Sequence, residues 1–307
     1  MILCCGEALI DMLPRESRAG EPAFAPYAGG AVFNTAIALG RLRVPVGFFS
    51  GLSSDLFGQQ LRDVLAASHV SAELAAISER PTTLAFVRLV DGHATYTFYD
   101  ENTAGRMLTE ADLPALPAAV DAMLFGAISL IPEPCGSTYE ALMLREHERR
   151  VTMLDPNIRP GFIPDRAKHR ERIRRMMAMA DIVKLSDEDL GWFGEAGTAE
   201  EVIARWLDAG PKMIVMTRGA RGAVAYTKRG TVTAEARTVM VVDTVGAGDT
   251  FNAGLLASLH ESGALSKAAL ADLPEETIAA ALAFGVKAAA VTVSRAGANP
   301  PWRDELE

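Results

Sequence analysis

The chain alternates short apolar runs with longer segments in which apolar residues recur at the spacing of a helix. Runs of four to six apolar residues are typical of buried strands. Because strands and helices alternate, we expect crossover connections between parallel strands, in a sheet covered by helices on both faces. We therefore predict an α/β core with a mostly parallel sheet. The predicted strands are residues 2–5, 46–51, 121–126, 151–154, 180–185 and 212–216, and the predicted helices are residues 34–42, 137–150, 250–261 and 276–293.

Residues 82–99 follow a different pattern, because apolar and polar positions alternate with a period of two on either side of Asp91-Gly92. An Asp-Gly pair between two alternating segments is a strong signal for a β-hairpin. One hairpin cannot bury both of its faces, so we predict that it joins residues 9–13 and 24–27 in a small sheet over the main core. Residues 239–242 form another apolar run, which we interpret as the end of a strand.

Composition narrows the class of protein. A chain of 307 residues with 49% apolar content can bury a core of one large α/β domain or two ordinary ones. The net charge of −9 argues against a nucleic-acid or anionic-membrane surface, although a nucleotide could still bind locally.

The three cysteines, Cys4, Cys5 and Cys135, lack the spacing of a zinc site and are expected to be buried thiols. No uninterrupted apolar run approaches about 18 residues, and residues 1–7 lack the positive charge of a signal peptide. We expect a cytoplasmic protein.

The segment before the helix at 250–261 has the composition of an anion site. Two glycines around one alanine allow a tight turn in which successive N–H groups converge at the positive end of a helix dipole. A carboxylate in that turn could remove a proton from a hydroxyl that attacks a bound phosphate. The alternative is that this aspartate only caps the helix. The residues concerned are Asp243, Thr244, Gly246, Ala247, Gly248 and Asp249.

Three more polar positions stand where strands end or helices begin. Asp11 is set among apolar neighbours, Gly30 precedes a predicted helix that carries Asn34 in its first turn, and Arg159 follows a strand between two prolines. Each also has an ordinary structural explanation. Asp11 could be an aspartate of a surface turn, Gly30 could belong to an ordinary loop before a helix, and the segment of Arg159 could be a loop held extended by its two prolines. In parallel sheets, however, ligands bind at the carboxyl ends of the strands, and an arginine there suits phosphate chemistry.

These segments resemble the signatures of the ribokinase-like (PfkB) carbohydrate kinases, and the resemblance extends over nearly the whole chain. It implies a three-layer α/β/α fold with a small β-sheet lid, as one domain over residues 1–307 with lid segments at about 9–28 and 81–105. Residues 243–249 match the C-terminal signature, and Gly29-Gly30 through Asn34 match the N-terminal one. The family also implies closure of the lid on the sugar and a homodimer formed through the lids.

The resemblance assigns roles residue by residue. Gly246, Ala247 and Gly248 would form an anion hole for the γ-phosphoryl group, Asp249 would be the general base, and Arg159 would meet the phosphoryl group or the sugar. Asp11, Gly30 and Asn34 would bind the sugar, and Thr217, Gly219, Gly222 and Thr244 would bind ATP.

Metal sites are less well defined by the motifs. The resemblance implies Mg²⁺ with the ATP, but the N-x-x-E motif of the family is replaced by Ser186 and Asp189, with Glu188 alongside. Which carboxylate orders the ion is left open. In relatives a monovalent cation such as K⁺ is held by backbone carbonyls. The matching positions here are Asp243, Val245 and the turn around Gly297.

The substrate is expected to be a neutral sugar. Relatives that phosphorylate 2-keto-3-deoxygluconate often carry an arginine after Phe-Tyr, whereas this chain has Asp100, which would repel a sugar acid. Residues 80–86, 129–134 and 184–188 most resemble bacterial fructokinases. We predict phosphorylation of D-fructose at position 6, with 2-keto-3-deoxygluconate, ribose or adenosine as alternative substrates. A dehydrogenase or Walker ATPase is disfavoured because their glycine motifs are missing. A silent sugar or nucleotide sensor is the alternative outside catalysis.

Overall fold

The computed structural model describes residues 1–90 and 93–307. Its core is a nine-stranded sheet in the order β15-β14-β13-β12-β11-β10-β1-β4-β6. All neighbours from β13 to β6 are parallel, whereas β14 pairs antiparallel with both β13 and β15. The strands are β1 (Ile2–Cys5), β4 (Val46–Phe49), β6 (Val70–Ser71), β10 (Ala122–Gly126), β11 (Val151–Asp155), β12 (Ile182–Ser186), β13 (Met213–Thr217), β14 (Ala223–Thr227) and β15 (Gly230–Ala234).

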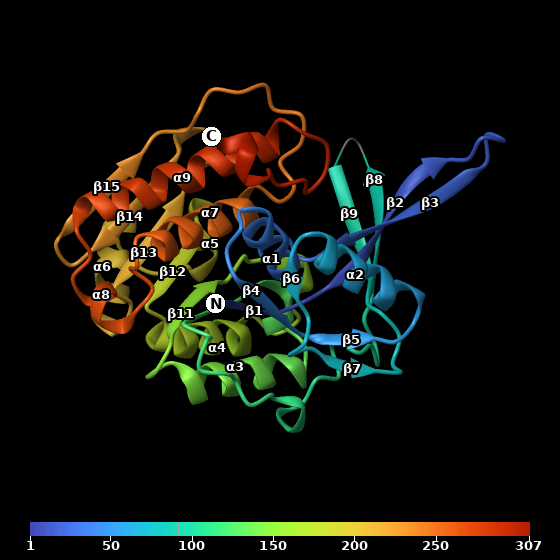
Figure 1. Cartoon of the computed structure of the whole chain (residues 1–307), viewed down its shortest axis with the longest axis horizontal. Coiled ribbons are helices and arrows are strands. Elements are labelled where there is room, and N and C mark those ends of the chain that lie inside the picture. Colours follow the sequence, from blue (N-terminus) through green and yellow to red (C-terminus); the bar gives the residue numbers. More distant parts are fainter. Residues whose placement is uncertain (91–92) are drawn as a thin grey trace.

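Helices cover both faces of this sheet, and Figure 1 shows α7 and α9 on one side with α3 and α4 on the other. Successive strand residues point to opposite faces: Ile2 and Cys4 join one apolar core, while Leu3 and Cys5 join the second. The predicted three-layer arrangement is confirmed. The helices are α1 (Ala31–Arg41), α2 (Leu56–Ala67), α3 (Cys135–Glu146), α4 (Arg166–Met179), α5 (Asp187–Phe193), α6 (Ala199–Ala209), α7 (Ala247–Glu261), α8 (Lys267–Ala271) and α9 (Glu275–Val293).

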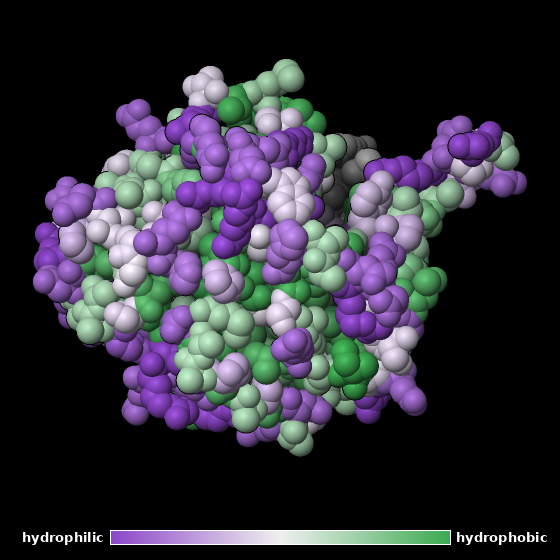
Figure 2. Space-filling model, viewed as in Figure 1, coloured by the Kyte–Doolittle hydropathy of each residue, from purple (hydrophilic) through white to green (hydrophobic). Residues whose placement is uncertain are grey.

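A separate four-stranded sheet projects from one end of the core, as predicted (Figure 1). Its order is β3-β2-β8-β9, formed by β2 (Leu9–Glu16), β3 (Pro22–Gly29), β8 (Leu84–Val90) and β9 (His93–Tyr99). The predicted turn at Asp91-Gly92 lies outside the described residues, but β8 and β9 pair antiparallel on either side of it. Figure 2 shows that the projecting end of β2 and β3 is mostly hydrophilic. β5 (Gly51–Ser53) and β7 (Ala76–Ser78) form a third, two-stranded parallel sheet.

The interpretation of residues 239–242 as a strand is wrong. The segment forms no ladder, its side chains are largely exposed, and only the Val242 amide bonds to the carbonyl of Val293. After the edge strand β15 ends at Ala234, no helix or strand is formed before α7 begins at Ala247, so this apolar run lies outside the sheet.

Helix α9 is long and apolar enough to cross a membrane by length and composition alone. In this fold it packs against α7, and Ile278, Ala281 and Leu282 are buried in the core. The same composition is typical of a core helix.

Candidate active site

Helix α7 begins at a turn in which the Ala247 amide makes only a long bond of 3.3 Å to the carbonyl of Thr244, and among the described residues the Gly246 and Gly248 amides have no backbone acceptor outside the helix. Gly246 is the N-cap residue with a φ of 76°, in the left-handed region that favours glycine. A Cβ at this position would lie 2.8 Å from the Cβ of Ala298. The first N–H groups of a helix have no partner within it, and no side chain of the described residues caps this one. The turn can therefore bind an anion at the positive end of the dipole of α7.

A buried ammonium group lies next to this turn. A Cβ on Gly248 would lie 3.1 Å from Nζ of Lys184. This Nζ is 3.0 Å from Oδ2 of Asp155, and the side-chain amide of Asn252 donates to the same oxygen at 2.6 Å. Burial alone would lower the pKa of Lys184, but the carboxylates of Asp155 and Asp189 raise it above its usual value. The ammonium group therefore remains charged and adds to the positive potential at the start of α7.

Asp249 does not cap the helix, so the alternative reading as a cap is wrong. Its Oδ2 accepts a hydrogen bond of 2.9 Å from Nδ2 of Asn34, and its backbone oxygen accepts one from the hydroxyl of Thr35. Burial raises the pKa of Asp249 to about 6; the bond from Asn34 and the charges of Lys184 and Arg159 oppose the rise, and Asp155 adds to it. At neutral pH the group is an ionised carboxylate of higher basicity than an ordinary aspartate, as a general base requires.

The small sheet contributes Asp11 from β2. Burial raises the pKa of Asp11 to about 6. Gly29 and Gly30 pass close by: a Cβ on Gly29 would lie 2.3 Å from Oδ2 of Asp11, and one on Gly30 would lie 2.8 Å from the carbonyl oxygen of Glu7. Gly30 also has a φ of 112°. A side chain at Gly29 would collide with Asp11 and one at Gly30 with the backbone of Glu7, so glycine fits both positions.

Tyr96 of β9 lies within electrostatic range of Asp11 in the small sheet and of Asp243 and Arg159 in the core. Burial raises its pKa, the charges of Asp11 and Asp243 raise it further, and that of Arg159 lowers it. The charge of Arg159 also lowers the pKa of Asp249. Arg159 therefore lies within electrostatic range of both the lid sheet and the start of α7. The structure brings the predicted sugar residues, the arginine and the anion turn to one region.

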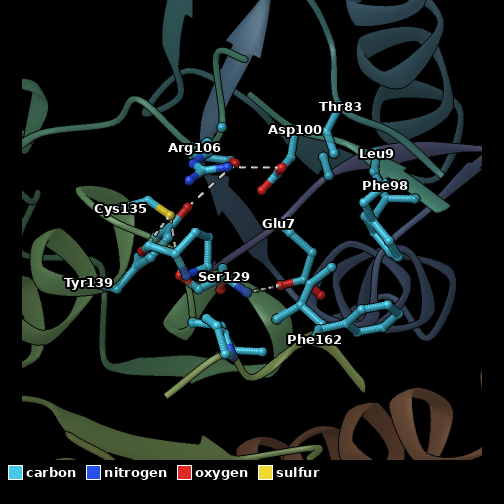
Figure 3. Close-up of a pocket in the computed structure, with 17 residues that line it drawn as sticks. Glu7, Leu9, Thr83, Phe98, Asp100, Arg106, Ser129, Cys135, Tyr139 and Phe162 are labelled. Carbon is cyan, nitrogen blue, oxygen red and sulfur yellow. Dashed lines mark hydrogen bonds and ion pairs between the residues drawn. The ribbon is translucent and has the colours of Figure 1, made fainter. Parts of the chain in front are cut away.

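A cavity of about 280 Å³ adjoins this region. Figure 3 shows Glu7 facing into it, with Asp100 and Arg106 on one wall and Phe98 near Phe162 on another. The two phenylalanine rings are 4.6 Å apart between centroids. The carboxylate of Glu7 accepts bonds from the amides of Ala31 at 2.8 Å and Val32 at 3.3 Å. Burial raises its pKa to about 7. The cavity therefore lies beside the first turn of α1, which carries Asn34.

A family model described as the pfkB family carbohydrate kinases matches residues 1–305. The chain belongs to this PfkB family. It is 59% identical over 278 residues to a fructokinase of Rhizobium leguminosarum bv. trifolii, covering 91% of this chain and 85% of the relative. It is 32% identical to fructokinase-2 of Zea mays, covering 98% of this chain and 90% of the relative.

Solved structures agree with this assignment. The structure of fructokinase with bound ATP from Xylella fastidiosa matches with a TM-score of 0.91 at 30% identity, covering 99% of this chain and 96% of that chain. A fructokinase of Vibrio cholerae O395 with bound fructose, ADP and calcium matches with a TM-score of 0.83 at 25% identity, covering 97% and 94%. The protein is therefore a PfkB sugar kinase with the ribokinase-like fold.

Three of the residues predicted to bind ATP in this PfkB kinase stand at or just after the end of β13, and the fourth, Thr244, stands in the turn before α7. Thr217 ends β13 and pairs in register with Ser186 at the end of β12. Gly219 begins a 3₁₀ turn, and Gly222 ends it with a φ of 82°. Thr244 is exposed, and its carbonyl oxygen accepts a bond from the Ala247 amide. Their contact with a nucleotide stays a prediction.

The predicted cation residues fall in two places. The carboxylate of Asp243 accepts bonds from the amides of Val245 at 3.0 Å and Gly297 at 2.8 Å, which joins the anion turn to the turn after α9. Asp189 is buried; it accepts bonds from the amide and hydroxyl of Ser186 and from the amide of Ile158. Among the described residues, no group of three or more His, Cys, Asp or Glu side chains could hold a metal ion.

Sequence reasoning missed the buried group behind the anion turn. Lys184, Asp155 and Asn252 received no role, although a lysine in an otherwise apolar strand and a strand-ending aspartate were visible signals. A charged side chain in a buried strand requires a partner. Nothing local in the sequence identifies which partner, because Asn252 is 97 residues away from Asp155.

Proposed function

We propose that this PfkB kinase transfers the γ-phosphoryl group of ATP to D-fructose and forms fructose 6-phosphate. The observation that carries the proposal is the bond between Asn34 and Asp249, which places the sugar-side helix against the anion turn. The 59% identity to a bacterial fructokinase supports fructose as the acceptor.

In the proposed reaction the sugar lies against Asp11, the backbone of Gly30 and Asn34. The carboxylate of Asp249 takes the proton of the hydroxyl on carbon 6 as that oxygen attacks the γ-phosphorus. The new bond joins this oxygen to phosphorus, while the bond between the γ-phosphorus and the β–γ bridging oxygen breaks, and ADP leaves. A pKa of about 6 keeps Asp249 ionised at neutral pH and able to accept the proton.

The negative charge of the transferring group requires stabilisation from fixed positive groups. The backbone N–H groups of Gly246, Ala247 and Gly248 are proposed to bind the phosphoryl oxygens. Arg159 approaches the same place from the end of β11, within electrostatic range of Asp249. Lys184 adds a fixed charge behind the turn, next to Gly248.

ATP is proposed to bind at the ends of β12 and β13, with Thr217, Gly219, Gly222 and Thr244 around it. Mg²⁺ commonly takes one or two carboxylates together with substrate phosphates and water, and the acidic start of α5 fits that donor set. Asp189 is held there by Ser186, and the neighbouring Glu188 is exposed. When bound, Mg²⁺ neutralises charge on the phosphates. A monovalent cation such as K⁺ would use carbonyls of Asp243, Val245 and the turn around Gly297.

The small sheet is proposed to act as a lid that closes over the sugar and excludes water from the phosphoryl group. Its aromatic residues are half-exposed: Phe24 is 49% and Tyr99 is 60% accessible, and both pack against Phe86. Such a surface suits contact with the lid of a second subunit, so we also propose a homodimer. We place the enzyme in the cytoplasm.

The proposal is tested by ADP release with ATP and Mg²⁺ across a panel of D-fructose, ribose, adenosine and 2-keto-3-deoxygluconate. We expect fructose to give the highest kcat/KM and phosphate to be found on carbon 6 of the product. A higher value with another acceptor would replace fructose. Sugar binding without ADP release would instead support a sensor.

A further inference from the structure

Asn252 of α7 has a buried oxygen atom without a hydrogen-bond partner. The side chain is 2% exposed, and its Nδ2 donates to Oδ2 of Asp155 at 2.6 Å. With the amide reversed, two acceptor oxygens would lie this close together, so the nitrogen faces Asp155. Oδ1 of Asn252 therefore points elsewhere, and it accepts no hydrogen bond from any of the described residues. A buried acceptor of this kind requires a donor.

A small cavity lies beside this side chain. Its volume is about 10 Å³, close to the least space that one water molecule needs. Asn252 and Asp249 both line it, and because they are three residues apart on α7, their side chains are neighbours on the helix surface. The other polar residues that line it are Thr35, Asp155 and Asn157. The cavity therefore joins the unpartnered oxygen to the carboxylate that is proposed as the base.

The groups around Asp249 favour an occupant that donates hydrogen bonds. Helix α1 supplies the amide of Asn34, β11 supplies the charges of Asp155 and Arg159, and β12 supplies that of Lys184. Strand β10 contributes only apolar residues and a glycine to the lining. The ammonium group of Lys184 already pairs with Asp155 at 3.0 Å. A water molecule has two hydrogens, so it can donate to the unpartnered amide oxygen and to the Asp249 carboxylate together.

We propose that this cavity is a site for one internal water molecule, which donates to Oδ1 of Asn252 and to the carboxylate of Asp249. The inference rests on the proposed function, because it takes Asp249 as the general base. A hydrogen bond from water favours the ionised form of a carboxyl group, whereas the charge of Asp155 opposes ionisation of Asp249. The water thus keeps the base charged, and Asn252 is a positioning residue that acts on the base through this water.

The water site is tested in crystals of the wild-type protein, at a resolution that shows ordered water. We expect an electron-density peak within about 2.5–3.0 Å of both Oδ1 of Asn252 and a carboxylate oxygen of Asp249. Crystals soaked in rubidium chloride should show no anomalous peak at this place. An empty cavity, a peak within this distance of only one of the two residues, or a rubidium peak would overturn the proposal.

The role of Asn252 is tested by the pH profile of kcat/KM for fructose in Asn252→Leu, whose side chain has a similar size and makes no hydrogen bonds. We expect the midpoint of the acid limb to rise by roughly half to one pH unit, because the Asp249 carboxylate loses a donor. At pH 8, where this carboxylate is ionised in both proteins, kcat/KM should stay close to the wild-type value. The crystals of the wild-type protein test the site even where this variant folds poorly.

The direction of the shift distinguishes the water from the direct contact between Asn252 and Asp155. Loss of that contact alone would weaken the hold on the Asp155 charge. A weaker charge there would lower the pKa of Asp249, because the charge of Asp155 raises it. An unmoved or lowered midpoint, or an equal loss of kcat/KM at every pH, would therefore overturn the proposal.

The matched control is Thr152→Val at the start of β11, the strand that Asp155 ends. This change also removes a buried hydrogen-bonding group, which donates to the carbonyl of Met179 at 2.9 Å. The midpoint of its acid limb should equal that of the wild-type protein, and a shift as large as that of Asn252→Leu would overturn the proposal. A wild-type protein that phosphorylates no sugar would overturn the proposed function instead, and the density at the water site would still decide whether the water is there.

Discussion

The side-chain amide of Asn34 donates a 2.9 Å hydrogen bond to Oδ2 of Asp249, although the two residues are 215 positions apart in the chain. Asn34 stands in the first turns of α1 and Asp249 in the first turn of α7, and the two helices pack against each other. The bond fixes the Asp249 carboxylate against α1, the helix whose N-cap residue is Gly30. A sugar held at the start of α1, as proposed, would lie beside the base.

The acid side of the pH profile should reflect more than one carboxylate. Burial raises the pKa of both Asp249 and Asp11 to about 6. Both must be ionised, one to take the proton and the other to accept bonds from sugar hydroxyls. We expect log kcat/KM for fructose to fall below about pH 6 with a slope that approaches two per pH unit. A slope of one throughout, measured from pH 5 to 8 by ADP release, would mean that only one of them titrates in the reaction.

Asp249 should cost the protein stability at neutral pH. Its folded pKa of about 6 exceeds the ordinary value of 3.8, so the folded state holds the proton more tightly. The contribution of Asp249 to the free energy of unfolding is therefore most favourable below about pH 4, and it is lost as the pH rises through about 6. Asp249→Asn should raise the free energy of unfolding at pH 8 by about 1–3 kcal/mol.

Urea unfolding of the wild-type protein and of Asp249→Asn at pH 8 and pH 4 measures this. The difference should shrink toward zero at the lower pH. A stabilisation of equal size at both values would show that packing, and not the buried charge, is responsible.

Lys184 should be required for folding as much as for catalysis. Lys184→Met removes the ammonium group that pairs with Asp155 at 3.0 Å, and both residues are about 95% buried. An uncompensated buried carboxylate costs about 3–5 kcal/mol. The double variant Lys184→Met/Asp155→Leu should recover most of that loss in urea unfolding. If it is no more stable than the single variant, the pair is not the source of the effect.

The sequence predicts the layers of the fold because its strands are nearly continuous apolar runs, such as residues 121–126. It does not indicate α4, and the reason is specific. The buried positions of that helix follow the spacing of an amphipathic helix, but two of them are His169 and Arg172. Arg172 is satisfied by the carbonyl of Leu130 and the carboxylate of Glu133. Apolar periodicity cannot reveal a buried face made partly of charged side chains.

The sequence could predict those parts of the candidate site that are formed by one continuous segment. Gly246 to Asp249 and Gly30 to Asn34 each contain their own geometric requirement, a tight glycine turn before a helix. The junction between such segments depends on tertiary packing. For that reason the sequence could not predict that the Lys184 side chain lies next to Gly248. It also could not predict the ion pair between Asp100 and Arg106.

The most direct test of the account is the turnover of Asp249→Asn with fructose and ATP, measured by ADP release and paired with calorimetric binding of fructose. We expect kcat to fall by about 10²–10⁴, the usual contribution of a general base, while the Kd for fructose changes little. Turnover close to that of the wild-type protein would contradict the account. So would an equal loss of turnover and fructose binding, because Asp249 would then support the structure of the site and not the transfer of the proton.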